Sequence, residues 1–196
     1  MVVERLAERM GAGRWKPRYA GRFVELAGPA GQLALLVPTT YMNLSGEAAG
    51  PAAGSLKATR PQVLVVHDDL DLPFGTVRGK IGGGSGGHNG LRSITQRLGG
   101  DDYLRVRIGI GRPPAEFRGD QADWVLMGFT EPQDAVDAAL AEALAMTEVA
   151  IGEGMAVAIA RFHAAEPGSR ARKRREPDGE MADEPVEDGP VGPSES

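Results

Sequence analysis

The sequence predicts a single α/β domain, and three observations support this prediction. Residues 63–66 are a continuous run of β-branched residues and leucine, which is typical of a strand covered on both faces. A glycine-rich run at 82–87 precedes a helical pattern at 90–98, and another apolar strand is expected at 103–110. The length of 196 residues is enough for one such domain with a substantial core.

The remaining elements follow from periodicity and from turn residues. Apolar residues at helical spacing predict a helix at 2–10, which ends at Gly11. Strands at 21–27 and 32–37 are expected to form a hairpin around 28–31. Three further elements are expected: a helix of small residues that follows the polar loop 39–46 and ends near 56, a short strand at 76–81, and one long or broken helix at 132–162.

The chain changes in composition near its end. We expect a domain at 1–166 and a disordered tail at 167–196, because the tail has almost nothing to bury. The tail is basic at 170–175, and residues 176–196 then carry eight acidic and no basic side chains. Residues 1–175 therefore hold 22 basic against 19 acidic side chains, a net charge of +3. A mildly basic domain permits an RNA partner without requiring one, and the basic run is either an RNA contact or a solvated hinge.

Composition also limits the class of protein. The chain contains no cysteine, so it has neither a disulfide framework nor a thiolate metal site. No apolar run reaches the ~18 residues that a membrane-spanning helix needs. We therefore expect a cytoplasmic protein.

Polar residues that could bind a ligand or take part in catalysis follow the strand at 63–66. His67 and the acidic residues Asp68, Asp69 and Asp71 follow its carboxyl end, where α/β proteins usually bind ligands. The glycine-rich run lets the backbone approach a ligand, and the helix that follows offers free N–H groups to an anion. The stretch predicts a site for a polar, phosphorylated ligand.

Less specific readings apply to the same residues. Gly82-x-Gly84-x-x-Gly87 spells a dinucleotide fingerprint, but Asp101 and Asp102 precede the next strand instead of following it. The three acidic residues also fit a solvated turn, and a metal site is a weaker alternative because no second ligand cluster accompanies them. His67 fits a packed strand-end histidine and a functional one equally well, and His163 fits a surface position.

Four motifs in the same order closely resemble the bacterial peptidyl-tRNA hydrolase family. They are Pro38-Thr-Thr-Tyr-Met-Asn-Leu-Ser-Gly46, His67-Asp-Asp-Leu-Asp71, Gly82-Gly-Gly-Ser-Gly-Gly-His-Asn-Gly90 and Arg105-Val-Arg-Ile-Gly-Ile-Gly-Arg-Pro113. The resemblance runs from residue 1 to about 163. It implies a single domain with a mixed twisted sheet flanked by helices, a monomer, and no metal or other cofactor. The implied activity is hydrolysis of the ester that joins a peptide to tRNA.

The resemblance also implies roles for single residues. Tyr41, Met42 and Asn43 would line the substrate cleft, although Tyr41 by itself also fits a core aromatic. Asn89 would contact the RNA end and donate to the developing oxyanion, although an asparagine there also suits a helix N-cap. Asp68 would orient the catalytic histidine and stabilise its protonated form. Phosphates would meet the start of the helix at 90–98, with three basic residues as helpers: Lys80, Arg92 and Arg112.

The sequence departs from the family at its beginning. The family starts with a strand, a Gly-Asn-Pro-Gly loop and an Arg-His-Asn stretch that carries the catalytic base, and this sequence contains none of them. We expect either a true start upstream or a non-catalytic RNA-binding relative, and we favour the first because Asp68 has no purpose without its histidine. Loss of a central strand would expose the edges of its neighbours. A nucleotide-binding enzyme of the dinucleotide type is a third, weaker reading.

Overall fold

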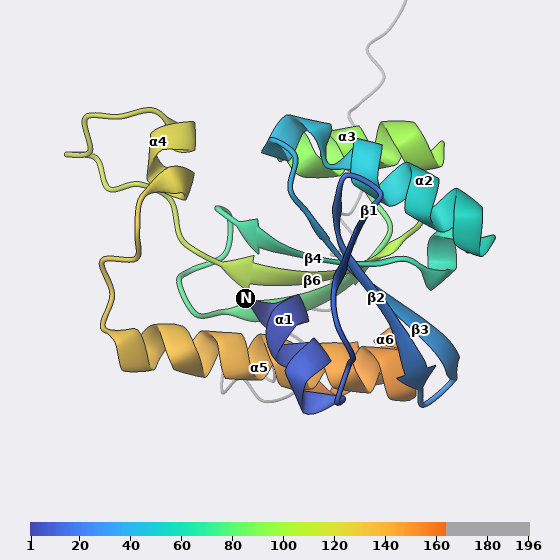
Figure 1. Cartoon of the computed structure of the whole chain (residues 1–196). Coiled ribbons are helices and arrows are strands. Elements are labelled where there is room, and N and C mark those ends of the chain that lie inside the picture. The colour runs from blue at the N-terminus through green and yellow to red at the C-terminus, as the bar shows by residue number, and fades with distance from the viewer. Residues whose placement is uncertain (164–196) are drawn as a thin grey trace, which may run out of the picture. The chain divides into compact units, whose positions relative to one another are not determined.

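The computed structural model describes residues 1–163 (Figure 1). The chain divides into two units, 1–165 and 166–196. The tail expected at 167–196, with its basic run at 170–175, lies outside the described residues.

The first sheet is a three-stranded antiparallel meander. It consists of β1 (Lys16–Arg18), β2 (Gly21–Gly28) and β3 (Gly31–Pro38), in that order. The hairpin of β2 and β3 confirms the prediction from the sequence, with Phe23 opposite Leu36 and a two-residue turn between Gly28 and Gly31. β1 was not predicted, because three residues with two cations and a proline carry no strand pattern. Its pairing with β2 is what makes it a strand.

The second sheet is mixed, as the resemblance implies. Its order is β4 (Leu64–Asp69), β6 (Leu104–Gly109), β5 (Val77–Ile81), with β4 parallel and β5 antiparallel to β6. Side chains of β4 alternate between two apolar clusters, since Leu64 and Val66 join one and Val65 the other. The strand is covered on both faces, but every residue of it remains partly accessible. Within residues 1–163, β4 pairs only with β6, so its other edge is open.

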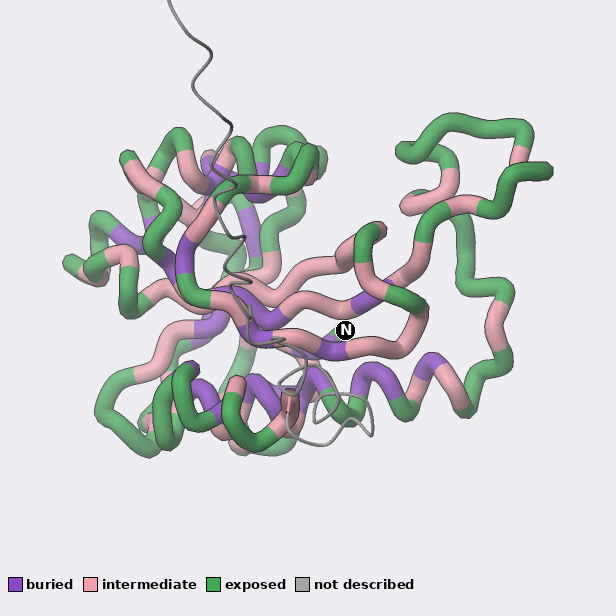
Figure 2. Tube along the Cα trace, turned by 180° about the vertical axis from the view of Figure 1, so that it is seen from behind, coloured by how far each residue is buried: buried purple, intermediate pink, exposed green. Residues whose placement is uncertain are grey.

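Helices cover the sheets on two sides (Figures 1 and 2). The main core lies against α5, where Leu140 and Met146 pack with residues such as Val24 and Val106 of the two sheets. The smaller cluster lies under α3 and contains Leu91. The bounds of the helices are α1 (Val2–Arg9), α2 (Gly46–Leu56), α3 (Asn89–Leu98), α4 (Gln121–Leu126), α5 (Gln133–Gly152) and α6 (Met155–His163), with short 3-10 turns η1 (Met42–Leu44) and η2 (Arg60–Gln62).

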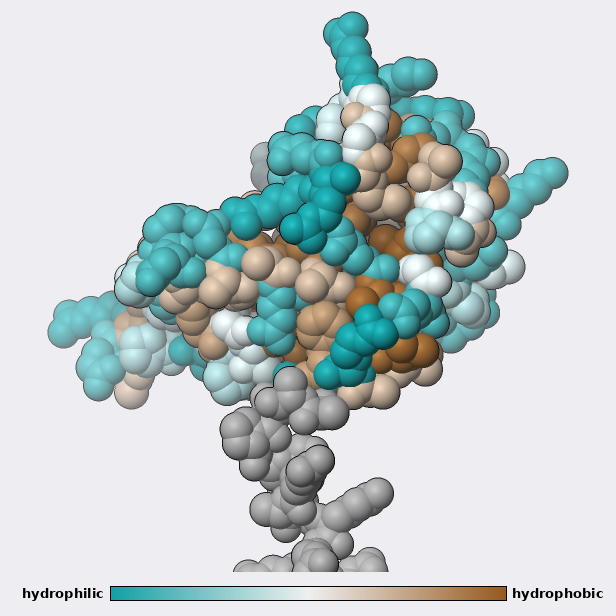
Figure 3. Space-filling model, turned by 90° about the horizontal axis from the view of Figure 1, so that it is seen from below, coloured by the Kyte–Doolittle hydropathy of each residue, from teal (hydrophilic) through white to brown (hydrophobic). Residues whose placement is uncertain are grey.

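The C-terminal helical region is broken, one of the two forms that the sequence predicts. Gly154 adopts a φ of +95° between α5 and α6 and so ends the first helix. His163, expected at the surface, instead accepts a hydrogen bond on Nε2 from the backbone N–H of Gly79 at 3.1 Å. In the view from below, hydrophobic residues are visible at the centre of the face between hydrophilic ones (Figure 3). Within residues 1–163, no helix is both long and apolar enough to cross a bilayer.

Candidate active site

The polar loop after β3 is fixed on α3 by short contacts. Ser45 Oγ donates to the carbonyl of Met42 at 2.8 Å, and the N–H of Gly46 donates to Ser93 Oγ at 2.9 Å. A Cβ on Gly46 would lie 2.2 Å from the backbone oxygen of Ser93, so only glycine permits this approach of α2 to α3. The loop therefore has a defined position beside the glycine run, which leads into α3.

The loop presents its predicted site residues outward. Tyr41 is 82% exposed, which excludes the core reading of this aromatic residue. Asn43 is exposed as well. Met42 is half exposed and its sulfur lies close to Gly90, since a Cβ there would be 2.7 Å from Sδ. Loop 38–46 and the start of α3 thus meet at Met42.

The glycine run has the backbone freedom that the sequence predicts. Gly82, Gly83, Gly86 and Gly87 have φ between +59° and +87°. Beneath the run lies the guanidinium of Arg105, which is 2% exposed and donates to the carbonyls of Gly83 and Gly84.

The helix after the run begins at a histidine cap. Nδ1 of His88 accepts the backbone N–H groups of Gly90 at 3.1 Å and of Leu91 at 3.3 Å. Asn89 therefore is not the N-cap, and this reading of it is wrong. Its side chain is exposed and makes no hydrogen bond within residues 1–163, so its amide is free for a ligand.

Asp68 contacts the other nitrogen of the same ring. Nε2 of His88 lies 3.4 Å from Oδ1 of Asp68. Because Nδ1 is an acceptor, Nε2 carries the proton and donates it toward the carboxylate. Burial by itself raises the pKa of Asp68, but the hydrogen bond from His88 and the other favourable interactions of the carboxylate together outweigh it and hold the pKa below its ordinary value. Asp68 is thus an ionised acceptor at neutral pH.

His67 is packed at the strand end, as its structural reading predicts. Its Nδ1–H donates to the backbone carbonyl of Asp68 at 2.6 Å, and its ring lies edge-on to that of His88 with centroids 5.1 Å apart. Nε2 is buried and has no partner within residues 1–163. Burial lowers the pKa of His67 from 6.5 to about 4, so the ring is neutral near pH 7.

The other two acidic residues, at the end of β4 and just beyond it, form ion pairs. Asp69 Oδ2 accepts from Nε of Arg107 at 2.7 Å, and Arg112 pairs with the exposed Asp71 at the loop surface. Burial raises the pKa of Asp69, but the hydrogen bond and charge of Arg107, together with the hydrogen bond from the backbone N–H of Asp71, outweigh it and leave that pKa below its usual range. Arg112 is therefore already paired with a carboxylate, which makes it a weaker candidate for a phosphate contact.

Lys80 and Arg92, the other two proposed helpers, make no ion pair within residues 1–163. Arg92 is exposed near the start of α3, and Lys80 is partly accessible with its Cε beside Gly83. Both remain candidates for phosphate contacts.

The dinucleotide reading is contradicted by the topology. A dinucleotide fingerprint lies in a βαβ unit whose two strands are parallel. The glycine run here connects β5 to α3, and α3 leads to β6, which is antiparallel to β5. The run is therefore a loop between antiparallel strands.

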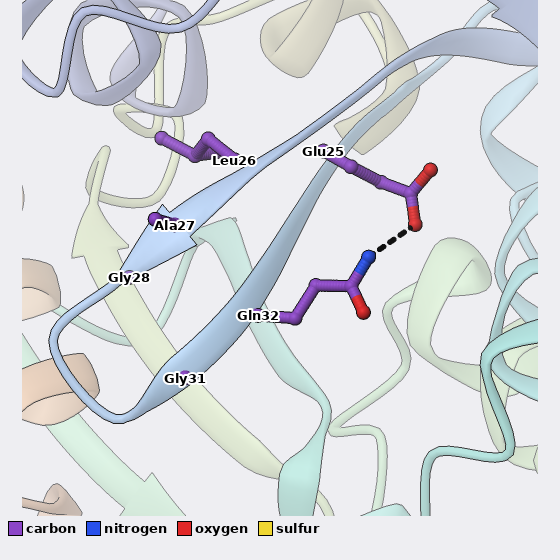
Figure 4. A pocket seen from close by; sticks show the side chains of 6 residues that line it. All are labelled: Glu25, Leu26, Ala27, Gly28, Gly31 and Gln32. Carbon is purple, nitrogen blue, oxygen red and sulfur yellow. Dashed lines mark hydrogen bonds between the residues drawn. The ribbon is translucent and has the colours of Figure 1, made fainter.

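An open depression lies elsewhere, over the β2–β3 hairpin (Figure 4). It is lined by Glu25, Leu26, Ala27, Gly28, Gly31 and Gln32. Gln32 Nε2 donates to Glu25 Oε1 at 2.8 Å, so the one acidic residue that lines the depression already has a hydrogen-bond partner. None of the predicted site residues lines it.

The comparisons with known proteins agree with the motifs. The model of the family described as peptidyl-tRNA hydrolase matches residues 1–172. The chain belongs to the peptidyl-tRNA hydrolase family. A family member from Mycobacterium tuberculosis is 46% identical over 166 residues, which are 84% of this chain and 86% of that protein. One from Sorangium cellulosum is 48% identical over 141 residues, 71% of this chain.

Solved structures support the same fold. The crystal structure of peptidyl-tRNA hydrolase from Acinetobacter baumannii has a TM-score of 0.73 and 32% identity, with 85% of this chain and 84% of that chain covered. The α/β fold of the family is thereby confirmed. The match to the Sorangium protein spans 60% of that relative's length.

The structure also identifies two residues whose importance was not predicted. His88 joins Asp68 to the start of α3, and Arg105 holds the glycine run from below. The position of His88 directly before a helix could have indicated that its side chain caps that helix. Nothing in the sequence indicated the contacts of Arg105, because a single arginine in a strand pattern does not show which carbonyls it will contact.

Proposed function

We propose that the protein acts on peptidyl-tRNA by hydrolysing the ester between the peptide and the tRNA. Family membership supports this reaction, and the contact between loop 38–46 and the start of α3 is the observation that carries it. Tyr41, Asn43 and Asn89 offer exposed groups on either side of that contact. The amide of Asn89 serves as donor to the RNA end and to the oxyanion that forms when water attacks the ester carbonyl.

Residues 1–163 supply the binding and electrostatic parts of this site without a free imidazole base. The sequence has three histidines. His88 uses both ring nitrogens, His163 accepts from Gly79, and Nε2 of His67 is buried. The ionised Asp68 can orient a base but is itself weakly basic because its pKa is lowered.

The test is hydrolysis of an N-blocked aminoacyl-tRNA by the full 196-residue chain, beside the Mycobacterium tuberculosis relative. We expect the chain to bind the substrate, with deacylated tRNA as a competitor. We expect hydrolysis ~10²–10⁴-fold slower than that of the relative, the usual contribution of a positioned base. Turnover within about tenfold of the relative would show that one of the histidines acts as base.

A non-catalytic RNA-binding role is the second candidate, and the engagement of all three histidines favours it. The two candidates differ in one measurement. If the protein is a slow hydrolase, the rate of hydrolysis should fall further in Asn89→Ala. If it only binds RNA, neither the parent chain nor the variant should hydrolyse the ester above background, although the parent chain still binds tRNA.

A further inference from the structure

The turn between β1 and β2 is built from two residues in an unfavourable backbone conformation. Tyr19 and Ala20 have φ of +55° and +47°, which a two-residue hairpin turn of this kind requires and which Asn-Gly usually supplies. Contacts around Tyr19 hold the conformation. Its hydroxyl donates to Ser55 Oγ at 2.7 Å, and its ring meets that of Phe23 edge-on at 5.1 Å. The hydrogen bond to Ser55 thus fixes the turn on α2, which lies beside it (Figure 1).

Cations surround this turn. The guanidinium of Arg18 lies 4.5 Å from the centroid of the Tyr19 ring. Lys16 shares a strand face with Arg18, and Lys57 follows two residues after Ser55, at the exposed C-cap of α2. We call Lys16, Arg18 and Lys57 the basic hairpin surface.

The basic hairpin surface lacks compensating charge. Its three cations are exposed and form no ion pair within residues 1–163. Other cations of the domain pair with acids, as Arg22 does with Glu4 and Arg60 with Asp102. The sequence contains no acidic residue at 9–24 or at 48–67, the segments that build and flank this surface.

The surface connects to the candidate site through short links. The carbonyl of Ala20 accepts the backbone N–H of Thr39 at 3.0 Å, two residues before Tyr41. Helix α2 leads from the loop at Gly46 to the hairpin at Ser55, and its 11 residues span about 16 Å at 1.5 Å each. A polynucleotide rising ~3.4 Å per residue covers that length in about five nucleotides.

We propose that the basic hairpin surface binds backbone phosphates of the RNA about five nucleotides or more from the end held at the candidate site. The inference rests on the proposed function, since it assumes an RNA end at Tyr41 and Asn43. Arginine and lysine contact phosphates, and an arginine stacked on a rigid tyrosine is pre-organised for this. The effect is expected mainly for RNA longer than a trinucleotide, because a trinucleotide of ~10 Å is shorter than α2, which leads from the candidate site to Lys57.

The experiment compares Lys16→Gln/Lys57→Gln with Arg9→Gln/Arg161→Gln in the full chain. Both double variants remove two positive charges, but Arg9 and Arg161 lie on α1 and α6 and pair with Glu148 and Glu153. Arg18 is left unchanged because it covers Phe23. Binding of deacylated tRNA and of a trinucleotide ending in adenosine is measured at several salt concentrations, with thermal unfolding as the check on folding.

We expect the Lys16/Lys57 variant to bind tRNA more weakly at low salt, with a slope of log K against log salt shallower by about 1.4–1.8, since each lost phosphate contact contributes ~0.7–0.9. Trinucleotide binding and the control variant should match the parent. Equal weakening in both variants means that net charge alone acts, and it overturns the inference. Unchanged tRNA binding by the Lys16/Lys57 variant also overturns it, even if that variant binds another polyanion such as polyglutamate more weakly. If the parent binds neither RNA, the proposed function itself fails.

Discussion

The ring of His88 joins Asp68 of β4 to the first turn of α3. Nε2 lies 3.4 Å from Oδ1 of Asp68, and Nδ1 accepts the N–H groups of Gly90 and Leu91. One side chain thus has two separable roles, as a helix cap and as a hydrogen-bond donor to Asp68. A substitution can remove one duty or both.

His88→Ala removes both duties, and we expect it to lower the free energy of unfolding by ~0.5–2 kcal/mol for the cap alone. His88→Asn keeps a capping side chain but is too short to reach Asp68. It should retain most of the stability while the pKa of Asp68 rises, because its hydrogen bond from the ring is lost. Urea unfolding at pH 7 measures the first effect, and carboxyl NMR titration the second. Equal instability of the two variants would contradict this division of roles.

Acid should destabilise the domain in two separate pH ranges. The pKa of His67 is lowered from 6.5 to about 4, so the unfolded chain binds a proton that the folded chain excludes. Stability from this group is complete above about pH 6.5 and falls as the pH drops toward 4, by about 2 kcal/mol between pH 7 and 5. Asp68 and Asp69 have lowered pKa values, so their contribution is lost only below their ordinary pKa near 3.8.

His67→Asn tests this assignment, because the amide can still donate to the carbonyl of Asp68 but does not titrate. Urea unfolding between pH 7 and 5 should be markedly flatter in the variant than in the parent chain. A decline as steep as that of the parent would assign the effect to another group.

Local patterns in the sequence predicted much of the fold. The hairpin of β2 and β3, the positive φ of the glycine run and the start of α3 follow from turn chemistry and periodicity. Features that depend on distant partners could not be predicted. β1 exists through its pairing with β2, and the order β4-β6-β5 is visible only in the sheet itself. The site residues Tyr41, Asn43 and Asn89 were named by resemblance, and their roles remain proposals.

Asn89→Ala now distinguishes function from stability more sharply than the sequence allowed. Because His88 is the cap and the exposed Asn89 side chain makes no hydrogen bond within residues 1–163, the substitution should change the free energy of unfolding by less than about 0.5 kcal/mol. It should weaken binding of the RNA end and slow single-turnover ester hydrolysis by ~10²–10³-fold, as loss of an oxyanion donor does. A stability loss near 1 kcal/mol with an unchanged rate per folded molecule would show that Asn89 has a structural role and not a catalytic one.

The buried Arg105 beneath the glycine run has two opposing effects on stability: its charge is costly to bury, and its hydrogen bonds are stabilising. Arg105→Met removes a buried charge, which is favourable, but leaves the carbonyls of Gly83 and Gly84 without their donors. We expect the lost hydrogen bonds to prevail, since charged donors contribute ~1.5–3 kcal/mol each, and the domain to lose about 2 kcal/mol of unfolding free energy. Amide exchange at 82–87 should accelerate more than exchange in the β2–β3 hairpin.

Arg112→Met is the control, because it breaks the exposed pair with Asp71. It should cost less than about 1 kcal/mol and leave amide exchange at 82–87 unchanged. A more stable Arg105→Met protein with unaltered exchange would mean that the cost of burying the guanidinium exceeds the value of its hydrogen bonds, and that the glycine run keeps its conformation without it.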